Sequence, residues 1–398
     1  MGEKERKERL KEPIPERELK RRHEAVRSVM KSMNIDCLIM QNCNKHLGGY
    51  VRWFTDVFAE NSYPITVIFP LNEEMTIISC GGPPRPAFPP LWATYGVKEV
   101  IGLPYFLTFN YTNTLDAEAT EKVIRQMKAK TVGIVGPAFI PSTFDKHLRN
   151  NLLNVEFLDI TDAIDEIKAI KSKDEFNLIK KTCAIQDSVI MAIPAFLHPR
   201  MKDIELRAII QHLLFDMGSE EQLLMLGSAP IGGLAKHSSP YLQNRVIGEN
   251  DYITVLIETN GPGGYYAEIA RVFCLNEPTE EMLKLWEANI KAQKICADML
   301  KPGANLFQIQ EALNSFLEEN GYPTENSLFA HGQGYDLVER PANLSEETIK
   351  IKPNMNIAIH PRLSTNTAFT FCCDNFFTTE FGCMRLHKAP QEIFVIPH

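Results

Sequence analysis

The sequence predicts two domains, an α/β domain over residues 1–165 and an α+β domain over residues 166–398. Three observations predict this division. The chain has 398 residues, which exceeds the size of one ordinary hydrophobic core. Before residue 165, helical and strand patterns alternate along the chain. After it, long amphipathic helices accompany strands of a mostly antiparallel sheet, and Ser172 suits the N-cap of the first of these helices.

The elements of the first domain follow from the spacing of its apolar residues. Residues 17–33 are basic and helical, and residues 116–129 suit a second helix. Short apolar runs of buried-strand type lie at residues 35–41, 63–70, 73–79, 131–136 and 155–160. Strands that alternate with helices are typical of an α/β layered unit.

The second domain has a different order of elements. After the helix that Ser172 caps, further amphipathic helices are predicted at residues 204–218, 280–300 and 305–321. Strands are predicted at residues 251–258, 265–275, 355–361, 368–380 and 392–396. Helices that pack against such a sheet make this half α+β.

Composition excludes several classes of function. The formal net charge of −8 leaves no basic surface for nucleic acid. No apolar run reaches the roughly 18 residues that span a membrane, so no membrane partner is expected. The first residues, MGEKERKERL, lack the apolar core of a signal peptide. The nine cysteines form no CxxC pair, which is typical of reduced thiols. We therefore expect a cytoplasmic protein.

The stretch IETNGPGGYYAEIARVF (257–273) places two carboxylates on either side of a tight turn. With the turn centred near Pro262, Glu258 and Glu268 face one another on adjacent strands, with Cβ atoms about 5 Å apart. Like charges directly opposite are destabilising. A bound cation, a shared proton with one raised pKa, or solvent exposure would each relieve the repulsion, and the sequence leaves these alternatives open.

Further polar residues lie at strand ends or in glycine-rich loops of the same domain. They are His237, His331, His360, Cys373 and Asp374. Carboxylate and imidazole groups together form the ligand set of a hard or borderline divalent metal. Taken singly, a histidine at a strand end is more often a hydrogen-bonded structural residue. The hypothesis of a site depends on the convergence of these segments in one pocket.

The order of motifs along the chain resembles the pita-bread family of creatinase, prolidase and methionine aminopeptidase. The motifs are IKSKDEFNLIKK, GSAP…KHSSP, GYYAEIARVF, LKPGANLFQIQEALNSFLEENGY, AHGQGY, IKPNMNIAIHP and TTEFGCMRL. Their order and spacing extend over about 220 residues, and the resemblance covers nearly the whole chain. The resemblance implies a creatinase/prolidase-type N-terminal domain, a pita-bread catalytic domain and a homodimer.

The peptidases of this family bind two metals through Asp, Asp, His, Glu and Glu. By position, the resemblance places Glu268, His331 and His360 at three of these ligands. The other two fall at Ile257 or Glu258, and at Cys373 or Asp374. A dinuclear site needs bridging carboxylates to offset its charge, and a histidine in place of a glutamate removes one. We therefore expect either no metal or one divalent ion, with zinc, manganese or iron as the candidates.

Three functions remain open at this stage. The first is creatinase-like hydrolysis, or elimination, of a small C–N or similar bond. In it His237 shuttles a proton, Glu268 binds or polarises a cationic group, and His331 and His360 orient or donate protons. The second is a metal-dependent Xaa-Pro aminopeptidase or dipeptidase with an altered metal site, whose ligands come from Glu258, Glu268, His331, His360 and Asp374. The third is a peptide-binding protein without catalysis. The expected ligand is a small molecule or a short peptide.

Several residues near these motifs are candidates for substrate contact. Tyr335 and Arg340 follow His331 closely and could line the pocket. In related dimers, loops of the N-terminal domain reach the partner's cleft, which implies substrate contact for Arg52 and Trp53. The alternative is an ordinary surface loop with one anchored tryptophan. Arg271 lies on the strand face opposite Glu268, which favours a structural ion pair.

Overall fold

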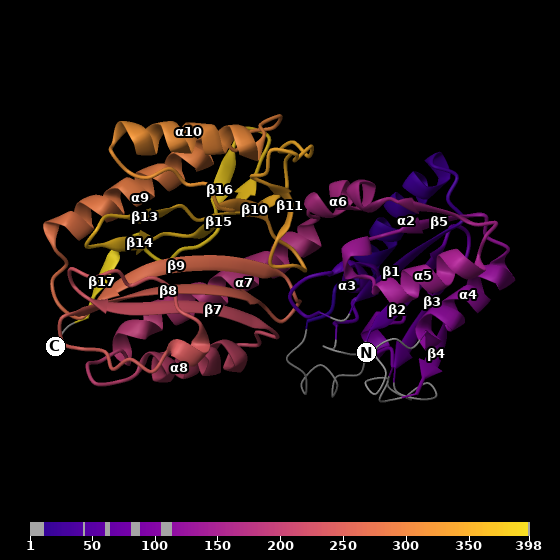
Figure 1. Ribbon diagram of the computed structural model, residues 1–398, viewed down its shortest axis with the longest axis horizontal. Coiled ribbons are helices and arrows are strands. Elements are labelled where there is room, and N and C mark those ends of the chain that lie inside the picture. Colours follow the sequence, from indigo (N-terminus) through magenta and orange to yellow (C-terminus); the bar gives the residue numbers. More distant parts are fainter. Residues whose placement is uncertain (1–11, 43, 60–63, 81–87, 105–113, 397–398) are drawn as a thin grey trace. The chain divides into compact units, whose positions relative to one another are not determined.

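The computed structural model describes residues 12–42, 44–59, 64–80, 88–104 and 114–396. The chain divides into two compact units, Met1–Lys168 and Ala169–His398. Their elements are labelled in Figure 1. Across the ranges just given, no helix is both long and apolar enough to cross a lipid bilayer.

The N-terminal unit is built around one mixed six-stranded sheet. Its strands are β1 (Cys37–Asn42), β2 (Ile65–Pro70), β3 (Met75–Cys80), β4 (Val97–Leu103), β5 (Thr131–Ile134) and β6 (Glu156–Asp159). Its helices are α2 (Glu16–Ser32), α3 (Tyr50–Thr55), α4 (Leu115–Met127), α5 (Ser142–Asn151) and α6 (Thr161–Ala169). The sheet order is β4-β3-β2-β1-β5-β6, and β1 pairs antiparallel with β2 and parallel with β5. The predicted α/β domain is confirmed.

The C-terminal unit combines four long helices with antiparallel sheets. The helices are α7 (Lys173–Ala192), α8 (Asp203–Asp216), α9 (Glu280–Asp298) and α10 (Leu306–Glu319). The longer strands are β7 (Gln222–Pro230), β8 (Asp251–Asn260) and β9 (Tyr266–Cys274). Shorter strands are β10 (Ala330–Gly332), β11 (Glu339–Ala342), β12 (Asn356–Ile359), β13 (Arg362–Ser364), β14 (Phe369–Phe371), β15 (Asp374–Thr378), β16 (Cys383–Arg385) and β17 (Ile393–Val395).

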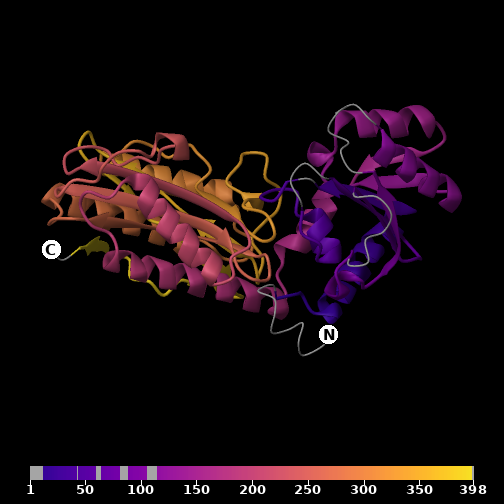
Figure 2. The ribbon, with the colours of Figure 1, turned by 90° about the horizontal axis from the view of Figure 1, so that it is seen from below.

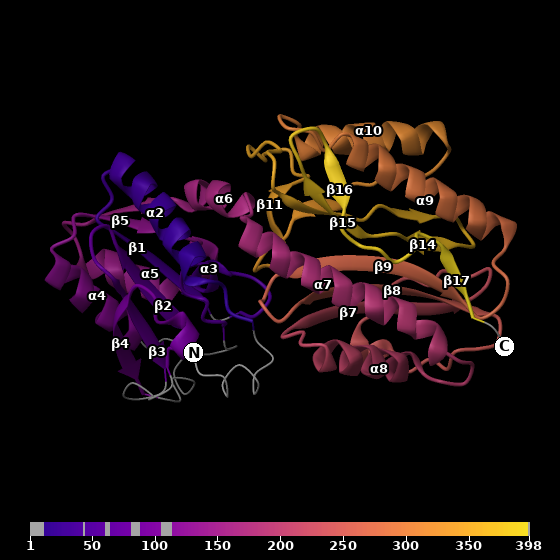
Figure 3. The ribbon, with the colours of Figure 1, turned by 180° about the vertical axis from the view of Figure 1, so that it is seen from behind.

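Three sheets form the β-layers of this unit. Their orders are β17-β9-β8-β7, β11-β10-β12-β15-β16 and β13-β14, and the described pairs are antiparallel except β17 with β9. The helices α7 and α8 lie across the first sheet (Figures 2 and 3), and α9 and α10 lie on the opposite side of the layers (Figure 1). As predicted, Ser172 caps α7: its side chain accepts a hydrogen bond from the backbone N–H of Glu175, and the Glu175 side chain bonds back.

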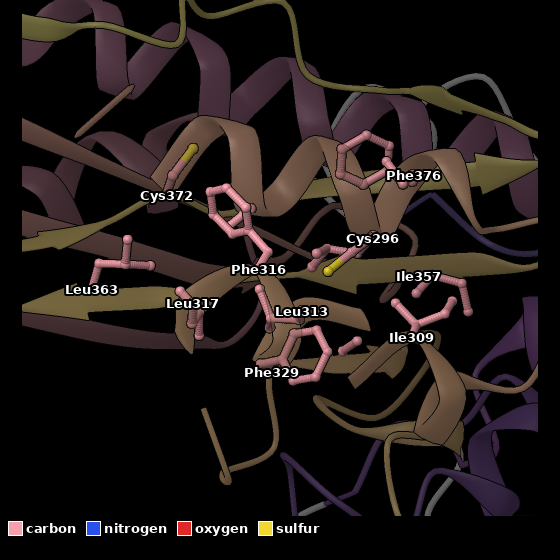
Figure 4. Packing of buried hydrophobic residues seen from close by; sticks show 14 of the residues in the cluster. Cys296, Ile309, Leu313, Phe316, Leu317, Phe329, Ile357, Leu363, Cys372 and Phe376 are labelled. Atoms are coloured by element: carbon pink, nitrogen blue, oxygen red, sulfur yellow. The ribbon is translucent and has the colours of Figure 1, made fainter. Parts of the chain in front are cut away.

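Apolar clusters fill both faces of the central β8–β9 hairpin. On one face, α9 and α10 enclose a cluster that includes Cys296, Leu313, Phe316, Phe329 and Phe376 (Figure 4). On the other face, α7 and α8 cover the hairpin's isoleucines. Every residue of both hairpin strands is buried. Solvent exposure therefore cannot relieve the repulsion between the two glutamates of this hairpin.

The strand expected at residues 368–380 is interrupted in the structure. It forms β14, which pairs with β13, and β15, which pairs with β12. Between them, Cys373 makes an isolated bridge to Ala270 of β9. The chain changes partner at this point and so links the hairpin sheet to the five-stranded sheet. A single strand was the wrong prediction because one apolar run can serve two sheets.

Candidate metal centre

Three strands bring one carboxylate and two imidazoles together. Glu268 lies on β9, His331 on β10, and His360 directly after β12. The Nε2 atoms of His331 and His360 lie 3.6 Å and 3.9 Å from Oε2 of Glu268. One ligand atom from each residue lies within 4.8 Å of the others, and all three residues are buried. The predicted convergence of these segments is therefore seen in the structure.

The backbone around His331 fixes the orientation of its ring. A side chain at Gly332 would have its Cβ 2.6 Å from the carbonyl oxygen of Arg340, so only glycine permits this close approach. Nδ1 of His331 lies 3.0 Å from the carbonyl oxygen of Gly332. A carbonyl only accepts, so Nδ1 carries the proton. In the neutral ring, the lone pair is then on Nε2, which faces Glu268 as in a metal-ligating histidine.

The other atoms of the group also fit a cation. Oε2 of Glu268 and Nδ1 of His360 are buried and make no hydrogen bond to any residue that the structure describes. A buried carboxylate oxygen without a partner is costly. A divalent ion beside Oε2 of Glu268 would remove this cost, and the nitrogen and oxygen donors suit zinc, manganese or iron.

The two glutamates of the hairpin are paired as predicted but differ in charge. Glu258 and Glu268 occupy directly opposed positions in the β8–β9 register. Burial, followed by the charge of Glu268, raises the pKa of Glu258 well above its ordinary value. Burial also raises the pKa of Glu268, but the adjacent His360 and His331 outweigh it, and the pKa is lowered. These surroundings thus favour the charged form of Glu268 and the protonated form of Glu258.

The strand register decides between Ile257 and Glu258, the two candidates for the position of the family's first aspartate. Ile257 packs in the apolar cluster beneath α7 and α8. Glu258 lies on the other face of β8, where its Oε1 accepts a hydrogen bond of 2.8 Å from Nε2 of Gln333. The side chain of Glu258 therefore enters the site. Its hydrogen bond to Gln333 engages one of the two oxygens that a metal would need.

The structure also distinguishes Cys373 from Asp374, the two candidates for the position of the family's last glutamate. Asp374 is fully buried in an ion pair with Arg271, with 2.8 Å between Oδ1 and Nη2, and it does not join the three-residue group. Asp374 is therefore not a metal ligand as expected, because its carboxylate is engaged by Arg271. The predicted structural role of Arg271 in an ion pair is confirmed. The thiol of Cys373 instead contacts the carbonyl oxygen of Glu268 at 3.4 Å.

A cavity of about 440 Å³ has His237 in its lining. It is lined by Lys236, His237, Pro323, Thr324, Glu325, Arg362, Ser364 and Phe369. The ring of His237 contacts Phe371, which in turn contacts the ring of His360, with centroid separations of 5.0 Å and 5.8 Å. Burial lowers the pKa of His237 to about 4. Its Nε2 has no hydrogen-bond partner within the described ranges.

The candidate substrate residues after His331 have structural contacts. The ring of Tyr335 packs against Tyr265 with 4.3 Å between centroids. Nη2 of Arg340 binds a carboxylate oxygen of Glu347 at 2.7 Å, and its Nε lies 3.1 Å from both oxygens. Neither residue lines the cavity beside His237. This fork-like pair gives Arg340 a structural contact, and its role in the pocket stays a prediction. For Tyr335, substrate contact stays a prediction.

Residues 50–55 form the helix α3, not a loop as expected, and all six are buried. Trp53 is 2% exposed, and the guanidinium of Arg22 lies 5.2 Å from its ring centroid. Nε of Arg52 lies 3.9 Å from a carboxylate oxygen of Asp56. Both side chains lie in the interior of the N-terminal unit. Their contact with substrate stays a prediction, and a surface loop is the wrong description.

Sequence reasoning missed four residues of the site. Gln333 and Asn375 form a buried amide network beside the glutamates, and Lys236 and Arg362 bring cations to the cavity. A signal was present in the sequence, because Gln333 lies two residues after His331 and Arg362 two residues after His360. Residues two apart in an extended stretch share a face, which would have placed Gln333 near His331, whereas Arg362 begins β13 in a different sheet from β12.

Comparisons with known proteins identify the family of this chain. Residues 177–387 match metallopeptidase family M24. The "Probable dipeptidase PepE" of Mycobacterium tuberculosis is 25% identical over 243 residues, which span 60% of this chain and 63% of that protein. The Xaa-Pro dipeptidase of Pyrococcus furiosus is 25% identical over 244 residues, spanning 60% of this chain and 68% of its own length. The match thus covers less than two thirds of the mycobacterial relative.

Solved structures show the fold over a longer stretch. The crystal structure of dipeptidase PepE from Mycobacterium ulcerans aligns with a TM-score of 0.78 and 19% identity, covering 97% of this chain and all of that one. This likeness confirms the predicted fold, an α/β N-terminal domain followed by a pita-bread domain. With the family match across more than half of its residues, the chain belongs to metallopeptidase family M24.

Proposed function

We propose that this protein is a metal-dependent hydrolase of short peptides, of the Xaa-Pro dipeptidase or aminopeptidase kind, with one divalent ion held by Glu268, His331 and His360. The observation that carries the proposal is the buried group of three donor atoms within 4.8 Å, in which Nδ1 of His331 lies 3.0 Å from the carbonyl oxygen of Gly332 and Nε2 faces Glu268. Two imidazoles and one carboxylate also form the three-ligand set of known catalytic zinc sites.

The residues around the centre have separate tasks. Glu268 supplies a charged oxygen, and the Gly332 carbonyl keeps the His331 lone pair on Nε2. A divalent ion in such a site polarises a carbonyl and lowers the pKa of bound water. His237 is neutral at pH 7 because its pKa is about 4. A neutral imidazole offers one N–H and one lone pair, so His237 hydrogen-bonds substrate rather than carrying a charge.

The cavity lined by His237 supports a peptide as substrate. Its volume of about 440 Å³ is within the range of small-ligand sites. Lys236 and Arg362 bring two positive charges, and Glu325 brings one negative charge. Nε of Arg362 lies 3.3 Å from Glu325, which leaves Lys236 as the uncompensated charge among the lining residues. A short peptide presents a terminal carboxylate that complements this cation.

The relatives favour this proposal over the creatinase-like reaction that the sequence placed first. The relatives described above are dipeptidases by name. Creatinase-like chemistry needs a histidine that titrates near neutrality, and burial lowers the pKa of both His237 and His360. A peptide-binding protein without catalysis remains the alternative that activity measurements would reveal. The expected homodimer and cytoplasmic location stay predictions.

A dipeptide assay with controlled metal content tests the proposal. Protein stripped by a chelator should release free amino acid from an Xaa-Pro dipeptide panel only after Zn²⁺, Mn²⁺ or Fe²⁺ is restored. Glu268→Gln and His331→Ala should abolish turnover, whereas the exposed matched controls Glu311→Gln and His212→Ala should not. Turnover that survives metal removal would support the creatinase-like reaction. No turnover, with peptide binding retained, would support the non-catalytic alternative.

A further inference from the structure

We infer that Gln333 limits this centre to a single metal ion, because its side-chain amide occupies Glu258, the carboxylate that a second ion would need. This inference rests on the proposed function and names a residue that sets the metal count of the same site. The two hairpin glutamates face each other across β8 and β9, which would otherwise allow them to hold two ions between them.

The direction of each amide in the network can be deduced from one backbone group. The backbone N–H of Glu268 donates to Oδ1 of Asn375 at 2.6 Å. A backbone N–H can only donate, so the other end of the Asn375 side chain is its NH₂ group. That group donates to Oε1 of Gln333 at 2.8 Å and to Oδ1 of Asn356 at 3.0 Å. Nε2 of Gln333 therefore faces Glu258.

Both N–H groups of Gln333 are used. One donates to Oε1 of Glu258 at 2.8 Å, and the other to the carbonyl oxygen of Leu337 at 3.1 Å. Gln333 and Asn375 are fully buried, so water cannot replace a broken bond. An amide donor that points at a carboxylate oxygen occupies the position from which a cation would approach. Moving Gln333 aside would leave several buried polar groups unsatisfied.

The outcome is an asymmetric pair of glutamates. Glu268 has its Oε2 without a hydrogen-bond partner in the described part of the chain, and two imidazole nitrogens lie within 4 Å of it. Glu258 is held by an amide and lies outside the three-residue group. The geometry thus provides one set of ligands with open lone pairs. At Glu258, by contrast, Oε1 already accepts a hydrogen bond from the neutral amide of Gln333.

Zinc counting tests this inference without an activity readout. Metal-free protein is dialysed against excess free Zn²⁺, and bound zinc per chain is measured by elemental analysis, with affinity from calorimetry. Wild type should bind one ion. Glu258→Gln, which keeps an acceptor for Gln333, should also bind one, with affinity within about tenfold of wild type because Glu258 is outside the first coordination shell. Glu268→Gln should lose the ion.

Removing the amide provides the converse test. Gln333→Leu, checked for folding by circular dichroism, should gain a second zinc ion, while the matched buried control Gln243→Leu should retain one. Two ions in wild type, with Glu258→Gln reducing the count, would overturn the inference, and retained dipeptidase activity would then leave the proposed function intact. One ion in Gln333→Leu would also overturn it. No ion in any variant would overturn the proposed function itself.

Discussion

The buried ion pair between Arg271 and Asp374 gives the sharpest stability prediction. Both side chains are fully buried. The Arg271 guanidinium donates to Asp374 and to four backbone carbonyls, those of Ala270, Cys373, Ala389 and Pro390. Arg271→Met removes all these donors and leaves a buried carboxylate without its closest cation. Breaking one partner of such a pair costs about 3–5 kcal/mol, so we expect a loss of that size.

The pH dependence of this loss follows from the charge of Asp374. Burial raises the pKa of Asp374, but Arg271 outweighs it, and the pKa lies below its ordinary value. In the wild type, the resulting stability is present above the unfolded pKa and is lost as the pH falls through the folded pKa. The deficit of Arg271→Met is therefore largest at neutral pH. It shrinks as acid protonates Asp374.

Urea unfolding of the full chain measures this effect, with zinc affinity as a second readout. Arg149→Met, which removes an exposed ion pair with Asp145, is the matched control and should cost less than about 1 kcal/mol. A folded Asp374→Asn variant should retain zinc, because Asp374 lies outside the metal-ligating group. A loss below 1 kcal/mol for Arg271→Met, or loss of zinc in a stable Asp374→Asn, would refute this reasoning.

Two further predictions concern a buried histidine and the cavity. Burial lowers the pKa of His23 to about 4 from 6.5, so the unfolded chain binds a proton in that window that the native state excludes. Stability should then fall by about 1.4 kcal/mol per pH unit as the pH is lowered through it. His23→Gln should remove this part of the slope in pH-dependent urea unfolding, and exposed His212→Gln should not. Lys236→Met should raise KM for free-acid dipeptides about fivefold, consistent with one exposed ion contact, but not for amidated ones. Exposed Lys301→Met should leave both KM values unchanged.

Strong local signals made much of the fold predictable. The capping sequence at Ser172 predicted the start of α7, and the turn near Pro262 predicted the pairing of Glu258 with Glu268. The helix α3 was missed because it has six residues and no side-chain cap, which is too short for helical periodicity to emerge. The break between β14 and β15 depends on which sheet each half joins, and one strand pattern does not contain that information.

The site was predictable only in part for a similar reason. Glu268, His331 and His360 followed from motif order, and the structure brings them together. Asp374 was a wrong candidate because residues alternate faces along the chain. Asp374 shares the side of Cys372, whereas Cys373 faces Glu268. The hydrogen-bonded amides of Gln333 and Asn375 were not predicted either. Which end of a side-chain amide donates depends on its hydrogen-bond partners rather than on sequence spacing.

The most direct test of the account is an anomalous diffraction map from crystals grown in Zn²⁺, recorded on both sides of the zinc absorption edge. The account predicts one zinc peak in each chain, within coordination distance of Glu268 Oε2 and the Nε2 atoms of His331 and His360. No peak there, or a pair of peaks bridged by Glu258 and Glu268, would contradict it.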